Sequence, residues 1–204
     1  MNNIILIGAG GHANSCIDVI ETEGKYNILG LIDNNISKNK RIYNYKIIGT
    51  DKDLKIIKKK CENAIICIGQ IKNYETRLKI YKLLKKNKYT LPIIQSPKSY
   101  KSKHSKIGDG TILMHGSIVN IGSIIGENCI INTSSLVEHD VIIGSHCHIS
   151  TKAVVNGGAR IGDCTFIGSG SVIHHNVKIG KNCIIGSNSI VDKDLPNNKL
   201  FIGK

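Results

Sequence analysis

The 204-residue sequence predicts a small parallel α/β domain followed by a parallel β-helix of about five coils. In the first half, apolar runs of strand length alternate with stretches of helical periodicity, which is typical of α/β folds. In the second half, an aliphatic residue recurs at every sixth position without a break. These two patterns predict two domains of different architecture.

Charge divides the chain at nearly the same place. The sequence has 28 Lys+Arg and 15 Asp+Glu, a formal net charge of +13. Residues 1–106 hold 21 basic and 8 acidic side chains, whereas residues 107–204 hold 7 of each. Such a shift is typical of a domain boundary, and the polar segment 95–106 reads as the connector. We therefore assign residues 1–98 to the first domain and residues 99–204 to the second.

Elements of the first domain follow from its apolar runs. A strand opens the segment 3–20, and a glycine turn and a stretch of helical spacing follow it. Further strands are expected at 27–33 and 63–69, with a basic helix over about 73–88. This alternation predicts a small Rossmann-like domain.

A nucleotide site is expected where these strands end. Backbone N–H groups at a helix N-terminus bind anions, and Asp33 stands where a ribose-binding acid is expected. The turn lacks the third glycine of the GxGxxG fingerprint, so a purely structural glycine turn is the alternative. The candidate substrate ligands are Gly8, Gly10, Gly11, His12, Asp33 and Gly69.

The second domain is a hexapeptide repeat. From Ile107 to Val191, every sixth residue is Ile, Leu or Val, at fifteen of fifteen positions. A small residue or Val stands two positions before each, so each hexad points one large and one small side chain inward. Glycines recur every eighteen residues from Gly108 to Gly180, which implies triangular coils with glycine at corners of positive φ. Three cysteines take the small inward position and are expected in the core: Cys129, Cys147 and Cys183.

Candidate catalytic residues lie in and after the segment 132–150. His139 is expected to face outward near a corner, and Asp140 can orient its imidazole or stabilise the protonated ring. Gly157 follows eighteen residues later and lies one coil, or about 5 Å, further along the prism. Its backbone N–H could hold a thioester carbonyl beside the base. His175, two coils from His139, is expected to line a coenzyme groove.

Other classes of site and partner are disfavoured. His146, Cys147 and His148 have the residue types of a zinc site, but alternation would place Cys147 opposite the histidines, so no metal is expected. The chain has two Phe and no Trp to stack on bases, which disfavours nucleic acid. The absence of a membrane-length apolar run and of a secretory signal predicts a cytoplasmic protein without membrane insertion.

Four features of the sequence belong together: the GAGGH turn, the strands ending in LID and IG, the segment NTSSLVEHDVIIGSHCHIS, and NGG followed by hexads. With these features the sequence resembles the NeuD/PglD type of sugar O-/N-acyltransferase over essentially the whole chain. This resemblance implies a left-handed β-helix, a homotrimer, and acetyl-CoA bound between neighbouring prisms. It implies that His139 is the general base assisted by Asp140, that His148 lies in the active site, and that the Gly157 N–H binds the acetyl carbonyl. The turn at 8–12 and Asp33 would hold the nucleotide.

Two departures from that family concern the site. Asp140 stands where PglD-like enzymes have Glu, and the sequence ends in FIGK, short of the usual GxPAK-like tail that contacts the coenzyme. The expected function is acetyl-CoA-dependent N-acetylation of a UDP- or dTDP-linked 4-amino-6-deoxy sugar for surface glycan biosynthesis. O-acetylation of sialic or legionaminic acid is the alternative within enzymes. A non-catalytic trimeric nucleotide-sugar-binding protein is the alternative of another class.

Overall fold

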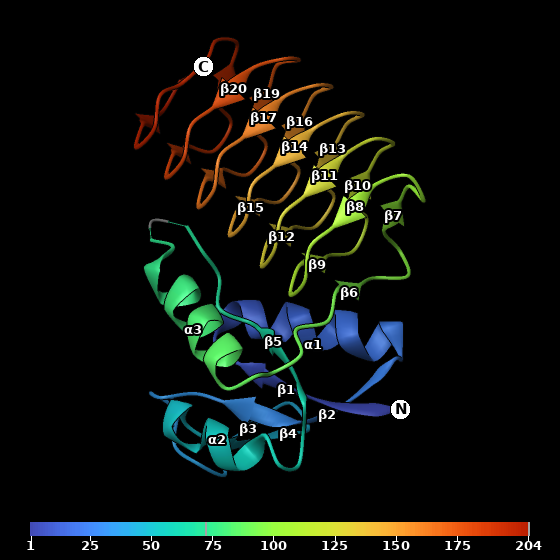
Figure 1. Cartoon of the computed structure of the whole chain (residues 1–204), viewed down its shortest axis with the longest axis vertical. Coiled ribbons are helices and arrows are strands. Elements are labelled where there is room, and N and C mark those ends of the chain that lie inside the picture. Colours follow the sequence, from blue (N-terminus) through green and yellow to red (C-terminus); the bar gives the residue numbers. More distant parts are fainter. Residues whose placement is uncertain (72, 204) are drawn as a thin grey trace.

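Two domains follow one another in the computed structural model, which describes residues 1–71 and 73–203 (Figure 1). The first contains a five-stranded sheet in the order β3-β4-β2-β1-β5, parallel except for β3, which is antiparallel to β4. Its elements are β1 (Asn2–Ile7), α1 (Gly11–Glu23), β2 (Tyr26–Ile32), β3 (Arg41–Ile42), β4 (Tyr45–Gly49), the 3₁₀ turn η1 (Asp51–Asp53), α2 (Leu54–Ile57), β5 (Asn63–Ile66) and α3 (Glu75–Lys86).

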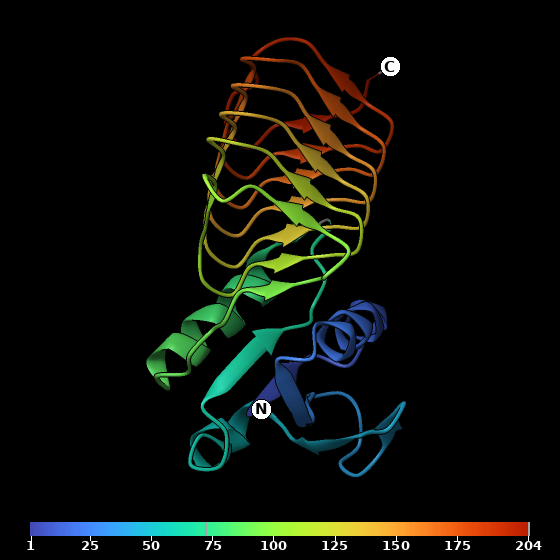
Figure 2. The ribbon, with the colours of Figure 1, turned by 90° about the vertical axis from the view of Figure 1, so that its right-hand side faces the viewer.

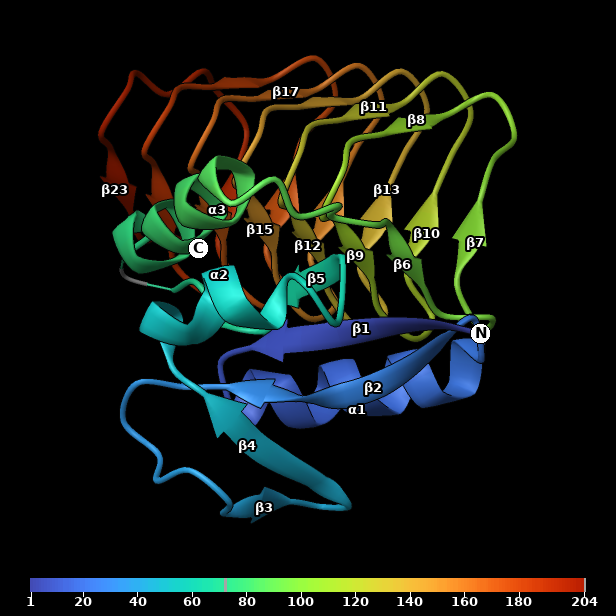
Figure 3. The same ribbon diagram turned by 60° about the horizontal axis from the view of Figure 1, so that its bottom comes forward.

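Helices cover both faces of this sheet, which confirms the expected Rossmann-like α/β arrangement (Figure 3). On one face, Ile17 of α1 packs in a cluster with Leu6 of β1. On the other, Leu54 of α2 and Ile80 of α3 pack in a cluster with Ile7. The carboxyl ends of β1, β2 and β5 therefore point toward the glycine turn and the start of α3, which is where ligands bind in open parallel sheets.

The second domain is a triangular prism of two-residue strands (Figure 2). Each strand pairs in parallel with the one eighteen residues further along, as Ile130 pairs with His148. The seven-stranded face has β6 (Ile94–Gln95), β9 (Ile112–Leu113), β12 (Ile130–Ile131), β15 (His148–Ile149), β18 (Phe166–Ile167), β21 (Ile184–Ile185) and β23 (Leu200–Phe201). The six-stranded face has β7 (Tyr100–Lys101), β10 (Ile118–Val119), β13 (Leu136–Val137), β16 (Val154–Val155), β19 (Val172–Ile173) and β22 (Ile190–Val191). The five-stranded face has β8 (Lys106–Ile107), β11 (Ile124–Ile125), β14 (Ile142–Ile143), β17 (Arg160–Ile161) and β20 (Lys178–Ile179).

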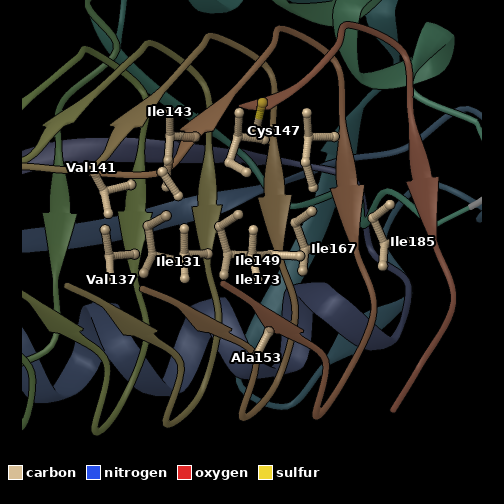
Figure 4. Packing of buried hydrophobic residues seen from close by; sticks show 14 of the residues in the cluster. Ile131, Val137, Val141, Ile143, Cys147, Ile149, Ala153, Ile167, Ile173 and Ile185 are labelled. Atoms are coloured by element: carbon tan, nitrogen blue, oxygen red, sulfur yellow. The ribbon is translucent and has the colours of Figure 1, made fainter. Parts of the chain in front are cut away.

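The core of the prism is the column of side chains that the hexad period predicts. Figure 4 shows Ile131, Ile149, Ile167 and Ile185 stacked on one another along the prism, each fully buried. The three repeat cysteines are 0% exposed, as expected for the small inward position: Cys129, Cys147 and Cys183. Strands β6, β7 and β23 extend the prism beyond the repeat of 107–191, and β6 lies ahead of the boundary expected between residues 98 and 99.

The glycine column has a different cause from the one expected. Positive φ angles occur two residues later, at positions such as Gly110 and Asn128, and not at Gly108 or its equivalents. A Cβ atom on Gly108 would lie 2.6 Å from the backbone of Gly126 in the next coil. Glycine is therefore required in this column because successive coils touch through their backbones.

The N-terminal domain sits on the seven-stranded face of the prism (Figure 1). Apolar residues of both domains share one cluster, in which Ile112 and Ile130 of the prism join Ile17 of α1. A hydrogen bond between the domains adds to this apolar contact: Arg77 Nε donates to the Asn128 carbonyl at 3.3 Å. This contact fixes the sheet ends of the first domain relative to the coils of the second.

Candidate active site

His139 lies at the corner of the prism between the six-stranded and five-stranded faces, after β13 and before β14. Its Nδ1 is 2.9 Å from Oδ2 of Asp140, so the aspartate reaches the ring although it is shorter than glutamate. A carboxylate accepts the proton on Nδ1, which leaves Nε2 of the neutral ring as a free base. Both side chains are exposed, by 61% and 70%. The pair is therefore a solvent-facing base with a fixed tautomer.

Gly157 lies directly over the reactive nitrogen of His139. A Cβ atom on Gly157 would stand 2.5 Å from Nε2, so only glycine leaves this nitrogen accessible. The neighbouring Gly158 N–H donates to the His139 carbonyl at 3.0 Å and aligns the two coils. Within residues 1–71 and 73–203, the Gly157 N–H donates no hydrogen bond. Both residues line one hollow, so a base and an N–H donor without a partner in the described residues belong to the same site, the two groups that acyl transfer uses.

The space in front of this pair is an open hollow of about 610 Å³. His175 lines it, where the sequence expected a coenzyme groove, and its ring lies nearly parallel to that of His174 at a centroid distance of 6.3 Å. The lining residues are Glu138, His139, Asp140, Asn156, Gly157, Gly158, His175 and Asn176. The sequence pattern did not indicate Glu138 and Asn156 as site residues, because the hexad period specifies which side chains point inward and not which outward ones line a hollow.

His148 does not join His139. It lies on the seven-stranded face and is 5% exposed, covered by the N-terminal domain. Its Nδ1 must donate to the Gln70 carbonyl, 2.5 Å away, because a carbonyl only accepts, and its Nε2 then accepts from Asn132 Nδ2 at 3.0 Å. Burial lowers the pKa of His148 to about 4. Within one chain His148 is neutral and both of its ring nitrogens are hydrogen-bonded, so its expected place in an active site shared with a neighbouring copy stays a prediction.

The residues considered for zinc are separated by the alternation of the strand. Cys147 points into the prism core, where Figure 4 shows it among aliphatic side chains, while His148 points outward. His146 is half-buried, and burial lowers the pKa of its ring. No three His, Cys, Asp or Glu side chains in the described ranges are grouped so as to hold a metal ion.

A second hollow lies at the carboxyl ends of β1 and β2, against α3. It has a volume of about 200 Å³, and Gly8 and Asp33, both expected as ligands, line it. The other lining residues are Ile7, Ile32, Asn34, Asn35, Asp51, Ile68, Thr76, Lys79 and Ile80. The ammonium group of Lys79 places a positive charge at this hollow. The sequence pattern did not indicate Lys79, because it is one of many lysines on a basic helix.

The glycine turn divides into structural and open positions. Gly8 has φ +102°, and a Cβ there would lie 2.6 Å from Ile68, so this glycine is required by the fold. Gly10 and Gly11 have nothing within 4 Å of a Cβ position. Gly10 caps α1 without a side-chain hydrogen bond, so the helix N-terminus faces open space, as an anion site needs. Gly69 is in ordinary contact with His12, 3.7 Å from its Cβ, and neither lines the hollow.

Asp33 organises the loops around the second hollow. Its Oδ2 accepts from the Ala9 N–H at 2.9 Å, and its Oδ1 accepts from Asn35 and Ile36 at 2.8 and 3.1 Å. Three backbone donors therefore hold the carboxylate in place before any ligand arrives. Asp33, the residue expected to bind ribose, therefore also holds the glycine turn in place through its hydrogen bond with Ala9.

Comparison with protein families divides the chain as the fold does. Residues 3–84 match the PglD N-terminal domain family, and residues 122–157 and 158–193 match the bacterial transferase hexapeptide family. The comparison with curated protein sequences gave no match. None of the helices in the described part of the chain is long and apolar enough to cross a bilayer.

Solved structures resemble the whole chain. A mutant of perosamine N-acetyltransferase from Caulobacter crescentus, in complex with CoA and GDP-perosamine, is 26% identical with a TM-score of 0.94, covering 100% of this chain and 94% of that one. The acetyltransferase domain of PglB from Neisseria gonorrhoeae, in complex with acetyl coenzyme A, is 25% identical with a TM-score of 0.92, covering 100% and 97%. WeeI from Acinetobacter baumannii, at 24% identity and a TM-score of 0.83 over 97% and 94%, shares the fold. These neighbours are left-handed β-helix acetyltransferases, which confirms the expected fold class and handedness.

Proposed function

We propose that this chain, an acetyl-CoA-dependent sugar acyltransferase with a PglD N-terminal domain and a hexapeptide-repeat β-helix, acetylates the amino group of a nucleotide-activated 4-amino-6-deoxy sugar. The resemblance to PglD-type enzymes expected from the sequence is confirmed by the family matches. The observation that carries the finer proposal is the pairing of the free Nε2 of His139 with the free N–H of Gly157.

The proposed reaction uses these groups in order. The sugar amine attacks the thioester carbonyl carbon, and His139 Nε2 takes the proton that the nitrogen loses. Asp140, 2.9 Å from Nδ1, stabilises the imidazolium that forms. The Gly157 N–H donates to the oxyanion of the tetrahedral intermediate. Collapse of this intermediate breaks the C–S bond, and the imidazolium returns the proton to the thiolate of CoA, which leaves an amide.

The nucleotide is proposed to bind in the 200 Å³ hollow of the N-terminal domain. Lys79 supplies a cation for a diphosphate. The N-terminus of α1 begins three residues after Gly8, outside the lining of this hollow, and offers backbone N–H donors to a phosphate that extends beyond it. UDP and dTDP are the nucleotides that the sequence favours, and GDP is the nucleotide of the perosamine complex that resembles this chain. All three therefore belong in any substrate panel.

The two hollows cannot serve one substrate within a single chain. The N-terminal domain covers the seven-stranded face, whereas His139 stands at the corner formed by the other two faces, on the opposite side of the triangle. A nucleotide sugar held by one copy would therefore be acetylated by His139 of another. This geometry supports the homotrimer that the sequence resemblance implies.

The six-stranded face offers the surface for this assembly. Its outward side chains are all apolar and form one column along the prism: Tyr100, Ile118, Leu136, Val154, Val172 and Ile190. Tyr100 is 57% exposed and Ile190 48%. The five-stranded face instead carries three basic residues, Lys106, Arg160 and Lys178, beside two isoleucines in the same outward column. Large exposed apolar surfaces mark interfaces, so we assign the contact between copies to the six-stranded face.

A substrate panel tests the proposed function. The protein is incubated with acetyl-CoA and UDP-, dTDP- or GDP-linked 4-amino-6-deoxy sugars, or with free sialic and legionaminic acids, and products are identified by mass. We expect N-acetylation of one amino sugar with equal release of CoA thiol. Acetylation of a free nonulosonic acid at a hydroxyl group would contradict the amino-sugar proposal. Absence of thiol release with every acceptor would favour a non-catalytic binding protein.

A further inference from the structure

The positive charge of this protein is concentrated on one layer of the N-terminal domain. Residues 51–88 hold 12 Lys+Arg and 4 Asp+Glu, a net charge of +8 within the +13 of the chain. These residues include α2 and α3, which pack on the same face of the sheet through Leu54, Ile80 and Leu84 (Figure 3). Their outer sides therefore face solvent on one side of the domain.

Lys79 is exposed on α3 but lines the nucleotide hollow, so we define the basic surface as the other exposed lysines of this layer: Lys52, Lys55, Lys59, Lys60, Lys82, Lys85, Lys86 and Lys88. Among the described residues, the ion pair between Lys58 and Glu62, at 3.6 Å, is the one that joins a lysine of the segment 51–88 to an acid. The lysines of the basic surface thus keep their charge uncompensated. Ile56 stands among them and is 65% exposed.

We propose that the basic surface binds an anionic lipid bilayer. Clusters of four to eight lysines attract anionic headgroups, and each basic side chain near the membrane adds to the attraction. Ile56 supplies an apolar side chain that can enter the interfacial region between the charges, as in peripheral membrane proteins. The surface is a docking face, distinct from a membrane-spanning segment.

The composition of the basic surface favours lipid over nucleic acid. Arg77, which is the single arginine of the segment, is 1% exposed and lies inside the fold, so the planar guanidinium forks that read base edges are absent from residues 51–71 and 73–88 of this surface. Tyr81 and Tyr89 are buried as well, and Tyr74 is partly buried, so this layer offers little aromatic surface on which bases could stack. Lysine ammonium groups without such partners suit mobile lipid headgroups.

The basic surface shares α3 with the nucleotide hollow, but none of its lysines lines either hollow. The hollow around His139 lies on the prism, and Lys79, which lines the nucleotide hollow, is not part of the basic surface. The inference therefore stands independently of the proposed acetyl transfer.

Vesicle sedimentation tests this inference with the full-length protein. Binding is measured to vesicles of phosphatidylcholine alone and with about 30% phosphatidylglycerol, at about 50 mM and 500 mM KCl. We expect binding about tenfold tighter to the anionic vesicles at low salt, and loss of that preference at high salt. Equal binding to both vesicles, or none to either, overturns the proposal.

A fourfold variant of the basic surface and a matched fourfold control on the prism show which surface binds the vesicles. Replacing four of its lysines by glutamate should reduce binding to anionic vesicles about tenfold or more: Lys55→Glu, Lys59→Glu, Lys82→Glu and Lys86→Glu. The same charge change on the prism should leave binding unchanged: Arg160→Glu, Lys178→Glu, Lys193→Glu and Lys199→Glu. Equal losses in both variants would show a net-charge effect and contradict the assignment. Far-UV circular dichroism and thermal melting confirm that each variant is folded.

Ile56→Ser separates lipid from nucleic acid at constant charge. It should weaken vesicle binding several-fold, because the apolar insertion is lost. Retardation of duplex DNA is measured in parallel at low salt. If the protein binds DNA more tightly than anionic vesicles, and Ile56→Ser leaves the DNA affinity unchanged, nucleic acid is the partner and the lipid proposal is overturned.

Discussion

The Nε2 atom of His139 lies 2.5 Å from the point that a Cβ atom on Gly157 would occupy. Gly157 is not among the glycines with positive φ, so alanine is allowed there by the backbone. The added methyl group would meet the imidazole itself. The absence of a side chain at this position is therefore a requirement of the site and not of the turn.

Gly157→Ala is expected to lower kcat about tenfold or more with little change in Tm, because the methyl group displaces or covers His139 Nε2. The measurement is CoA thiol release under saturating acetyl-CoA. In a His139→Ala background, Gly157→Ala should leave kcat almost unchanged, because the base that the methyl group would block is already absent. Additive losses in the double variant would mean that Gly157 acts elsewhere.

Asp140→Asn should reduce kcat about tenfold, because the amide cannot stabilise the imidazolium. Asparagine tolerates the left-handed φ of +59° at this position, so the fold should be retained. Asp140→Glu is the rescue variant, and a kcat of Asp140→Asn equal to that of the wild type would contradict the role of the carboxylate.

His148 should make the fold sensitive to acid. Burial lowers its pKa to about 4, while in the unfolded chain the ring titrates near its ordinary value of 6.5. The unfolded state therefore binds the proton more readily between these values, so stability falls as pH drops from about 6.5 to 4, by roughly 3 kcal/mol in total. Thermal melting across this range measures the loss.

His148→Phe should flatten that pH dependence, although its Tm at pH 7 should be lower because the bonds to Gln70 and Asn132 are lost. The exposed His104 is the control, and His104→Phe should keep the pH dependence of the wild type. A His148→Phe curve parallel to that of the wild type would show that another group carries the acid sensitivity.

The outward column of the six-stranded face should hold the copies together. Val154→Arg places a charge in the middle of this column and should yield the 22.3 kDa chain as a monomer in analytical ultracentrifugation. Ile124→Arg on the five-stranded face is the matched control and should stay oligomeric. Because the proposed site combines the two hollows of different copies, the monomer should also lose acetyl transfer. A monomeric wild type would remove the basis of the shared site.

Much of the architecture could be predicted because a strict period specifies it. The aliphatic residues from Ile107 to Val191 are the inward column of the prism, since no other arrangement satisfies a period of six over fifteen repeats. In the first domain, apolar runs and helical spacing predicted β1, α1, β2, β5 and α3 to within a few residues, whereas the four-residue α2 gave no signal. The antiparallel pair of the two-residue β3 and the five-residue β4 was not predicted, because a short edge strand has little detectable periodicity.

The candidate site was predictable only where it depends on the repeat. The eighteen-residue spacing places Gly157 against His139, and the structure has them in contact. His148 obeys the same repeat but lies on the face that the other domain covers, and a local pattern carries no signal of such a contact. Asp33 shows the same limit, because its three backbone donors come from loops whose conformation no motif specifies.

The most direct measurement is kcat for acetyl transfer by His139→Asn with the best sugar of the panel, alongside the KM for each substrate. The account predicts a loss in kcat of about tenfold or more with both KM values nearly unchanged, because His139 supplies the base and not the binding. A variant that retains the kcat of the wild type would show that another group accepts the proton and would contradict the proposed mechanism.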